Sequence, residues 1–184
     1  MKDNYKFLSK IDVIDLKNKI KELPNEMWNE HTLRQTRFKP HRHTQTLEIM
    51  WDTDSLQTNK IGKIHSNYYK LDMELFLNKI KPIYESNYGK GYFVRVLLVK
   101  LKSNTNIATH TDKGESLINC KRTHIPIITN KLVSFTVNNE KKYMDEGEIW
   151  EIDNTKEHSV DNHSNEDRIH LIVDYNTKQN KTLI

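Results

Sequence analysis

The chain reads YFVRVLLVKL over residues 92–101, and this apolar run is the first of a series in its C-terminal half. Shorter runs follow at residues 123–129, 133–137, 149–152 and 168–175, separated by turn-forming residues such as Asn138-Asn139 and Glu146-Gly147. Short strands divided by turn signals, without helical periodicity, are typical of a closed or sandwiched antiparallel sheet. The runs can be laid out as a jelly roll, in which two facing sheets enclose a pocket at one mouth.

The N-terminal half has a different pattern. Apolar residues at steps of three and four predict one helix over residues 9–23 and a second over residues 72–86. Asp72 is a candidate N-cap for the second helix, and Pro82 should kink or shorten it. Between the helices, residues 45–51 alternate well enough to predict a strand.

These patterns predict one domain over residues 1–184. Residues 1–91 form a flank of helices and a strand, residues 92–176 the β core, and residues 177–184 a tail. The expected fold class is mainly β, with the N-terminal helices packed on the larger sheet of a jelly-roll (cupin-like) core.

The composition of the chain indicates its cellular compartment and the partners it is expected to have. The net charge of +4 is too small to indicate nucleic acid as a partner. Cys120 is the only cysteine, so no disulfide can form within the chain. The N-terminus lacks a secretory pattern, and no apolar run has the length of a membrane span. We therefore expect a reduced, soluble, cytoplasmic protein with no membrane partner.

The candidate site begins with His110-Thr111-Asp112, followed by His158 and Arg168. Residues i and i+2 of an extended strand point to the same face, so His110 and Asp112 can direct two ligands to one ion. His158, from a neighbouring strand, would complete a set of two histidines and one carboxylate, which suits non-haem Fe(II) oxygen chemistry. Arg168 offers a planar fork that can hold a carboxylate by two hydrogen bonds.

The last apolar run predicts which side chains face the cavity. Within it, Arg168, His170 and Ile172 alternate with Ile169, Leu171 and Val173. If the second set packs against the helices, the first set faces the cavity. The run at 123–128 alternates in the same way and places His124 on the cavity side.

Each of these elements has a less specific explanation. A His-x-Asp sequence is often a surface turn, a lone histidine is more often a satisfied polar residue than a ligand, and an arginine is more often a surface ion-pair partner. Order, strand placement and the ten-residue gap from His158 to Arg168 agree with one another, and this joint pattern is harder to attribute to chance.

The segment from Val94 to Tyr175 also resembles the aspartyl/asparaginyl β-hydroxylase family of Fe(II)- and 2-oxoglutarate-dependent oxygenases. The matching residues are His110-Thr111-Asp112, Arg122-Thr123-His124-Ile125-Pro126, GEIWEIDN at 147–154, Glu157-His158-Ser159-Val160 and RIHLIVD at 168–174. The run from Gly147 through Asp174 is the most specific part of the resemblance.

The resemblance implies a double-stranded β-helix fold and assigns roles to the matching residues. It implies that His110 and His158 bind iron, and with Asp112 present we assign the full set of three ligands. Arg168 would hold the distal carboxylate of 2-oxoglutarate, and His124 would help to hold this cosubstrate. Arg122 would reach the substrate's carboxylate or a nearby cosubstrate oxygen.

One family feature has no clear match in this chain. A hydroxyl on the first long strand helps to hold the cosubstrate in the family. Val99 or a neighbour takes that place here.

The sequence therefore favours an Fe(II)/2-oxoglutarate-dependent dioxygenase that uses molecular oxygen to hydroxylate a C–H bond of an amino acid, free or peptidyl. Two imidazoles and one carboxylate leave three positions on six-coordinate iron, two for the keto acid and one for oxygen. The only catalytic residues we expect are the metal ligands. A non-catalytic cupin-like protein that binds metal or a small acid is one alternative, and an oxygenase that modifies nucleic acid is another.

Residues 34–43 form a basic stretch whose role stays open. Its histidine pair, His41 and His43, could bind metal, but the sequence favours a solvated basic loop. The whole stretch could contact an acidic substrate or nucleic acid, or it could form a polar lid over the pocket. We expect His65 and His163 on exposed turns, and Trp150 in the core.

Overall fold

The computed structural model describes residues 3–51 and 60–177; nearly all of the expected tail, residues 178–184, lies outside these ranges. The N-terminal elements are β1 (Tyr5–Lys10), α1 (Ile14–Lys21), the 3-10 helix η1 (Asn25–Asn29), α2 (Leu33–Arg37), the 3-10 helix η2 (Lys39–His41), β2 (Thr44–Met50), α4 (Ser66–Lys70) and α5 (Met73–Tyr88). The remaining elements are β3 (Tyr92–Leu101), β4 (Thr105–His110), α6 (Glu115–Asn119), β5 (Lys121–Ile128), β6 (Val133–Val137), β7 (Glu140–Lys142), β8 (Glu148–Ile152), β9 (His158–Asn162) and β10 (Arg168–Asn176).

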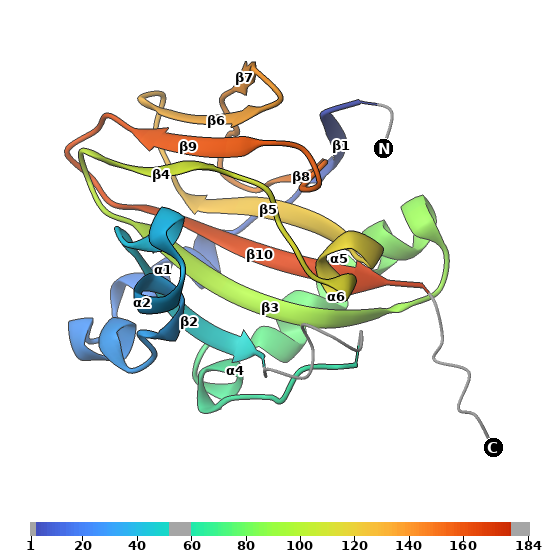
Figure 1. Cartoon of the computed structure of the whole chain (residues 1–184). Helices are drawn as coiled ribbons and strands as arrows, with labels where there is room; N and C mark the ends of the chain where they lie inside the picture. The colour runs from blue at the N-terminus through green and yellow to red at the C-terminus, as the bar shows by residue number, and fades with distance from the viewer. Residues whose placement is uncertain (1–2, 52–59, 178–184) are drawn as a thin grey trace.

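The strands form two sheets that face each other (Figure 1). The larger sheet has the order β1-β8-β5-β10-β3-β2, and the smaller has the order β4-β9-β6-β7. All pairings between these strands are antiparallel. This arrangement confirms the predicted mainly β, jelly-roll fold.

The alternation predicted for the last apolar run is confirmed in β10. Ile169, Leu171 and Val173 belong to the large core between the six-stranded sheet and the helices. That core also contains Leu16 and Ile20 of α1 and five residues of α5, namely Met73, Phe76, Leu77, Ile80 and Tyr84. The N-terminal helices therefore cover the outer face of the larger sheet. A second core fills the space between the sheets and includes Leu101, Ile107, Phe135, Ile152 and Val160.

The first helix was predicted too long at its N-terminal end. Residues 5–10 form an edge strand, in which Tyr5 lies opposite Ile152 and Lys10 opposite Glu148 of β8. This strand forms because its backbone pairs with β8. Its own sequence, YKFLSK, shows only weak alternation of apolar and polar residues. The helix begins at Ile14 and ends at Lys21.

The second helix extends beyond its predicted end. Asp72 occupies the N-cap position, but its backbone is left-handed (φ 49°, ψ 42°) and its side chain makes no capping hydrogen bond. Pro82 does not shorten the helix, which continues to Tyr88. Pro82 and Asn78 are both exposed, so water can satisfy the Asn78 carbonyl that lacks an N–H partner at Pro82.

Tyr92–Leu101 forms β3 with the predicted bounds. The sequence did not reveal β7 or the short helices α2, α4 and α6, because elements of three to five residues are too short for a period to show. None of the described helices is long and apolar enough to cross a membrane.

Candidate metal centre

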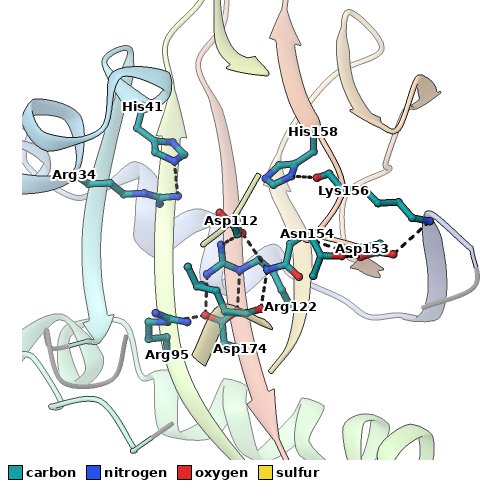
Figure 2. A network of polar contacts seen from close by, with 12 residues as sticks. Arg34, His41, Arg95, Asp112, Arg122, Asp153, Asn154, Lys156, His158 and Asp174 are labelled. Atoms are coloured by element: carbon teal, nitrogen blue, oxygen red, sulfur yellow. Dashed lines mark hydrogen bonds and ion pairs between the residues drawn. The ribbon is translucent and has the colours of Figure 1, made fainter. Parts of the chain in front are cut away.

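Three predicted ligands meet between the two sheets. His110 at the end of β4 lies directly opposite His158 at the start of β9, and the centroids of the two rings are 4.3 Å apart. Asp112 follows β4 by two residues and lies beside them; Figure 2 shows it near His158. One ligand atom from each of the three residues lies within 4.8 Å of the others, so they can hold one metal ion.

Backbone carbonyls orient both imidazoles. Nδ1 of His110 lies 2.8 Å from the Ala108 carbonyl, and Nδ1 of His158 lies 2.9 Å from the Lys156 carbonyl. A carbonyl can only accept, so Nδ1 carries the proton in both rings and Nε2 keeps a lone pair. Burial is the main factor that lowers the pKa of both imidazoles, which favours the neutral form that binds metals.

The Asp112 carboxylate is held by two side chains. Oδ2 accepts hydrogen bonds from Nη1 of Arg122 at 2.6 Å and from Nδ2 of Asn154 at 3.1 Å. Burial alone would raise the pKa of Asp112, but the Arg122 charge and these contacts outweigh burial and lower it. The carboxylate is therefore ionised and fixed in direction, as a metal ligand must be.

Arg122 lies at the site, but two carboxylates already bind its guanidinium. Its Nε and Nη2 donate to the two oxygens of Asp174 at 2.8 and 2.9 Å, while Nη1 donates to Asp112. Figure 2 shows this arginine between the two acids. The contacts support a role in orienting Asp112; its predicted contact with a substrate stays a prediction.

Arg168 is a buried cation with no acidic partner. Its side chain is 1% exposed, and no described carboxylate lies within ion-pair distance of it. Nη2 lies 2.5 Å from Nδ1 of His170, while Nε has no hydrogen-bond partner. Burial, together with the nearby Arg34 charge, lowers the pKa of Arg168 to about 9. A guanidinium in this environment would be stabilised by an anion.

Two cavities meet at His110 and Asp112, and His158 lies in the wall of the inner one. The inner cavity is lined by Val99, His124, Phe135, Val160, Arg168 and Ile172. The outer cavity, of about 420 Å³, is lined by Leu33, Phe38, Thr46, Glu48, Trp51, Arg95, Leu97 and Leu117. Both cavities share Arg34, His41, His110, Asp112 and Arg122 in their walls. The candidate ion would therefore lie between a small chamber that contains Arg168 and His124 and a larger, mostly apolar one.

A family model for aspartyl/asparaginyl β-hydroxylases matches residues 17–178. The chain belongs to this family. Among curated proteins, no sequence matches it significantly.

Several oxygenases of known structure share the fold of this chain. A 2OG-Fe(II) oxygenase family oxidoreductase from Burkholderia pseudomallei has 13% identity and a TM-score of 0.59, with 91% of each chain covered. A Trichoplax adhaerens prolyl hydroxylase, in complex with a hypoxia inducible factor peptide fragment, has 10% identity and a TM-score of 0.62, with 97% of this chain and 89% of that chain covered. A Pseudomonas putida prolyl-4-hydroxylase has 9% identity and a TM-score of 0.55, with 97% of this chain and 95% of that chain covered.

In this member of the family, the basic segment 34–43 lies over the candidate centre. Nη2 of Arg34 lies 3.4 Å from Nε2 of His41, and the His41 ring contacts the His110 ring edge-on at 4.9 Å (Figure 2 shows the first pair). His41 is buried, and burial followed by the Arg34 charge lowers its pKa far below the usual range. Among the roles that the sequence leaves open for this segment, this placement supports a polar lid over the pocket.

Sequence reasoning missed Arg95 and Asp174. Asp174 continues the inward-facing series of Arg168, His170 and Ile172 by one more step of two, and that periodicity could have identified it. Arg95 lies directly opposite Asp174 on β3 and donates to it through Nε at 2.7 Å.

Four other residues were discussed from the sequence, namely Val99, Trp150, His65 and His163. Trp150 is partly buried and packs against the core between the sheets. Val99 lines the inner cavity, and Thr46, opposite it on β2, has a buried hydroxyl with no hydrogen-bond partner among the described residues. His163 is exposed as expected, whereas His65 is half-buried and hydrogen bonds to the Trp51 carbonyl, so its predicted exposure was wrong.

Proposed function

We propose that the protein is an Fe(II)/2-oxoglutarate-dependent dioxygenase that hydroxylates a C–H bond of an amino acid, free or peptidyl. One observation carries this proposal. Two histidines and one aspartate converge on a point beside Arg168, a buried arginine that has no acidic partner in the described part of the chain. The family membership and the fold shared with 2OG-Fe(II) oxygenases support it.

The residues present fit both groups that this chemistry needs. His110, Asp112 and His158 provide the donor set preferred by non-haem Fe(II), with both Nε2 atoms available. Arg168 and His124 would hold the cosubstrate, since Arg168 Nε and His124 Nδ1 are buried without partners. With these groups bound, oxygen would be used to oxidise a substrate C–H bond while 2-oxoglutarate is decarboxylated to succinate.

The surrounding residues would position the site and exclude water. The Ala108 and Lys156 carbonyls hold the imidazoles, and Arg122 with Asn154 holds the carboxylate. Arg34 and His41 cover the junction of the two cavities, where a dry environment strengthens every charged contact.

The outer cavity is the proposed substrate site, and Arg95 is its proposed anchor. Arg95 is 1% exposed, and its Nη1 and Nη2 have no partner although its Nε is bound to Asp174. These two nitrogens match a carboxylate. Apolar walls from Trp51, Leu97 and Leu117 would contact the rest of the substrate. A substrate with a carboxylate beside an apolar body fits this cavity, as in an amino acid or a peptide bearing an acidic group.

The first experiment tests for cosubstrate binding and turnover. Anaerobic addition of 2-oxoglutarate to the Fe(II) protein should give a weak visible charge-transfer band, and admission of air should give succinate. His158→Ala should lose both, whereas His163→Ala, which changes an exposed histidine nearby in sequence, should keep both. If neither band nor succinate appears with the unaltered chain, the result would favour a non-catalytic cupin-like binding protein over the oxygenase.

A substrate screen tests the Arg95 assignment. Free amino acids, their amides and short peptides would be compared by succinate release. Faster release with free carboxylates than with the matching amides would support Arg95 as the anchor, and equal rates would contradict it.

A further inference from the structure

A second group of two histidines and one carboxylate lies at the edge strand β2, and its carboxylate, Glu48, lines the outer cavity. It consists of His31, just before α2, Glu48 in β2 and His65, just before α4. One ligand atom from each residue lies within 4.8 Å of the others. We propose that this group binds a second divalent transition-metal ion, with Zn²⁺ as the representative ion. The proposal does not depend on the function proposed above.

The spacing of the donor atoms supports an ion more than direct contacts. Oε2 of Glu48 lies 3.7 Å from Nδ1 of His31 and 3.6 Å from Nε2 of His65. Both distances exceed the usual range for a hydrogen bond, about 2.7–3.2 Å. Donors at about 2.0–2.2 Å from a tetrahedral Zn²⁺ are separated by about 3.4 Å. Both histidines are therefore too far from Glu48 for a hydrogen bond and lie close to the separation that Zn²⁺ requires, while the donor atoms of the two histidines lie within 4.8 Å of each other.

The backbone holds two of the three donors in place. The His65 amide donates to the Ile49 carbonyl at 3.0 Å, and Nδ2 of Asn67 donates to the Glu48 carbonyl at 3.1 Å. Glu48 itself lies opposite Leu97 in the β2–β3 pairing. The Glu48 side chain is only 13% exposed and the His65 side chain 21%. Glu48 and His65 thus form a preorganised, half-buried pair of donors.

His31 and the Trp51 carbonyl complete the arrangement. The His31 ring meets the His65 ring edge-on, with centroids 5.7 Å apart. Nε2 of His65 lies 2.9 Å from the Trp51 carbonyl, which can only accept, so Nε2 carries the proton in the metal-free protein. Binding through Nε2 requires the Nδ1–H tautomer, and this change frees the carbonyl oxygen as a fourth donor.

The ligand types select the class of metal. Imidazole nitrogen suits Zn²⁺, Cu²⁺, Ni²⁺ and Fe²⁺, while Ca²⁺ and Mg²⁺ prefer sites made of oxygen. An ion here would join the segment before α2 to the larger sheet. Because α2 carries Arg34, which covers the candidate iron site, the ion would also fix that cover in position.

A titration of the full chain with the first site removed tests the proposal. The His110→Ala/His158→Ala variant, stripped of metal by a chelator, would be titrated with Zn²⁺ against a chromophoric chelator. We expect it to bind one Zn²⁺ per chain. Adding His65→Ala or Glu48→Gln should weaken this binding at least about tenfold, because even partners outside the ligand shell contribute that much. Adding His163→Ala should leave it unchanged.

A second readout separates a built site from a loose surface contact. Co²⁺ bound to the His110→Ala/His158→Ala variant should show the visible bands of a four-coordinate ion, and Glu48→Gln, which keeps the side-chain shape, should abolish them. Circular dichroism would establish that each variant is folded. The proposal is overturned if the variant lacking the first site binds no Zn²⁺, or if its Zn²⁺ binding survives both His31→Ala and His65→Ala.

Discussion

Arg122 donates from Nη1 to Oδ2 of Asp112 at 2.6 Å and holds Asp174 with its two other guanidinium nitrogens. Asp174 also accepts a hydrogen bond from Nε of Arg95 at 2.7 Å. Asp174 lies opposite Arg95 on one neighbouring strand and opposite Arg122 on the other, so the charges alternate across the sheet. A candidate metal ligand is thereby tied to the rigid centre of the larger sheet.

The Arg122→Lys variant tests whether these hydrogen bonds orient Asp112. Lysine keeps the positive charge but loses the fork that joins Asp174 to Asp112, so the carboxylate ligand should lose its fixed direction. We expect metal affinity at the first site to fall about 10- to 100-fold. Co²⁺ titration of the stripped protein would measure this. Lys121→Ala, at the exposed neighbouring position, is the control; equal affinity in the Arg122 and Lys121 variants would contradict the prediction.

Arg168→Met tests the buried cation. Replacing a buried charge that has no carboxylate partner with an apolar side chain should leave the metal-loaded protein as stable or make it more stable. The concentration of 2-oxoglutarate needed should nevertheless rise more than about tenfold, because a charge-assisted bidentate contact is lost. Thermal unfolding with and without 2-oxoglutarate would show both effects, since a ligand stabilises only the state it binds.

The exposed Arg37→Met variant is the control for Arg168→Met. Iron affinity should change little in either variant. An unchanged requirement for 2-oxoglutarate in Arg168→Met would remove this residue from the cosubstrate site.

The sequence was sufficient to predict the fold because most of its strands are apolar runs separated by turn-forming residues. Apolar runs identified the long strands, and turn residues located their ends; Asn138 and Asn139, for example, have positive φ at the predicted turn. The edge strand β1 escaped prediction because its position depends on backbone pairing with β8.

The candidate site was predicted less completely than the fold. The His-x-Asp spacing places two side chains on one short segment, so His110 and Asp112 could be joined from the sequence alone. Their partners come from other strands: Asn154 follows β8, Arg122 is on β5 and Asp174 on β10. Only the register of the sheet brings these together, and a sequence pattern does not carry register between distant strands.

Acid should weaken the fold through Asp174. Burial alone would raise its pKa, but the Arg122 and Arg95 charges outweigh burial and hold the pKa well below the usual range. A carboxylate with a lowered folded-state pKa stabilises the protein above its unfolded-state pKa, about 3.9, and this stabilisation is lost as pH falls below that value. Asp174→Asn removes the charge at every pH.

Urea unfolding at several pH values would measure this effect. The free energy of unfolding of Asp174→Asn should be lower by about 3–5 kcal/mol at neutral pH, because two buried guanidinium groups lose their acid. The difference should shrink below about pH 4. The exposed Asp3→Asn variant should follow the unaltered protein. A difference that does not vary with pH would contradict the assignment.

Gly147, in the β core, should tolerate substitution poorly because it lies against Ile11 of the N-terminal flank. Its φ is +78°, and an added Cβ would lie 2.0 Å from the Ile11 carbonyl oxygen. The Ile11 amide donates to the Gly147 carbonyl, and the Gly147 amide donates to the Pro126 carbonyl, both at 2.9 Å. Neither backbone can move away without breaking these bonds, so Gly147→Ala should cost more than the positive φ alone.

Gly89→Ala provides the matched comparison, because Gly89 also has a positive φ but an added Cβ would meet nothing within 4 Å. It should cost about 1–3 kcal/mol from backbone strain alone, and Gly147→Ala should cost more in the same urea titration. The loss at Gly147 should concentrate in β1 and α1, which hydrogen exchange would detect. Metal binding by the folded fraction should persist, because His110 and His158 lie on the other sheet. Equal costs at the two glycines would show that the Ile11 segment can shift to accept the new methyl group.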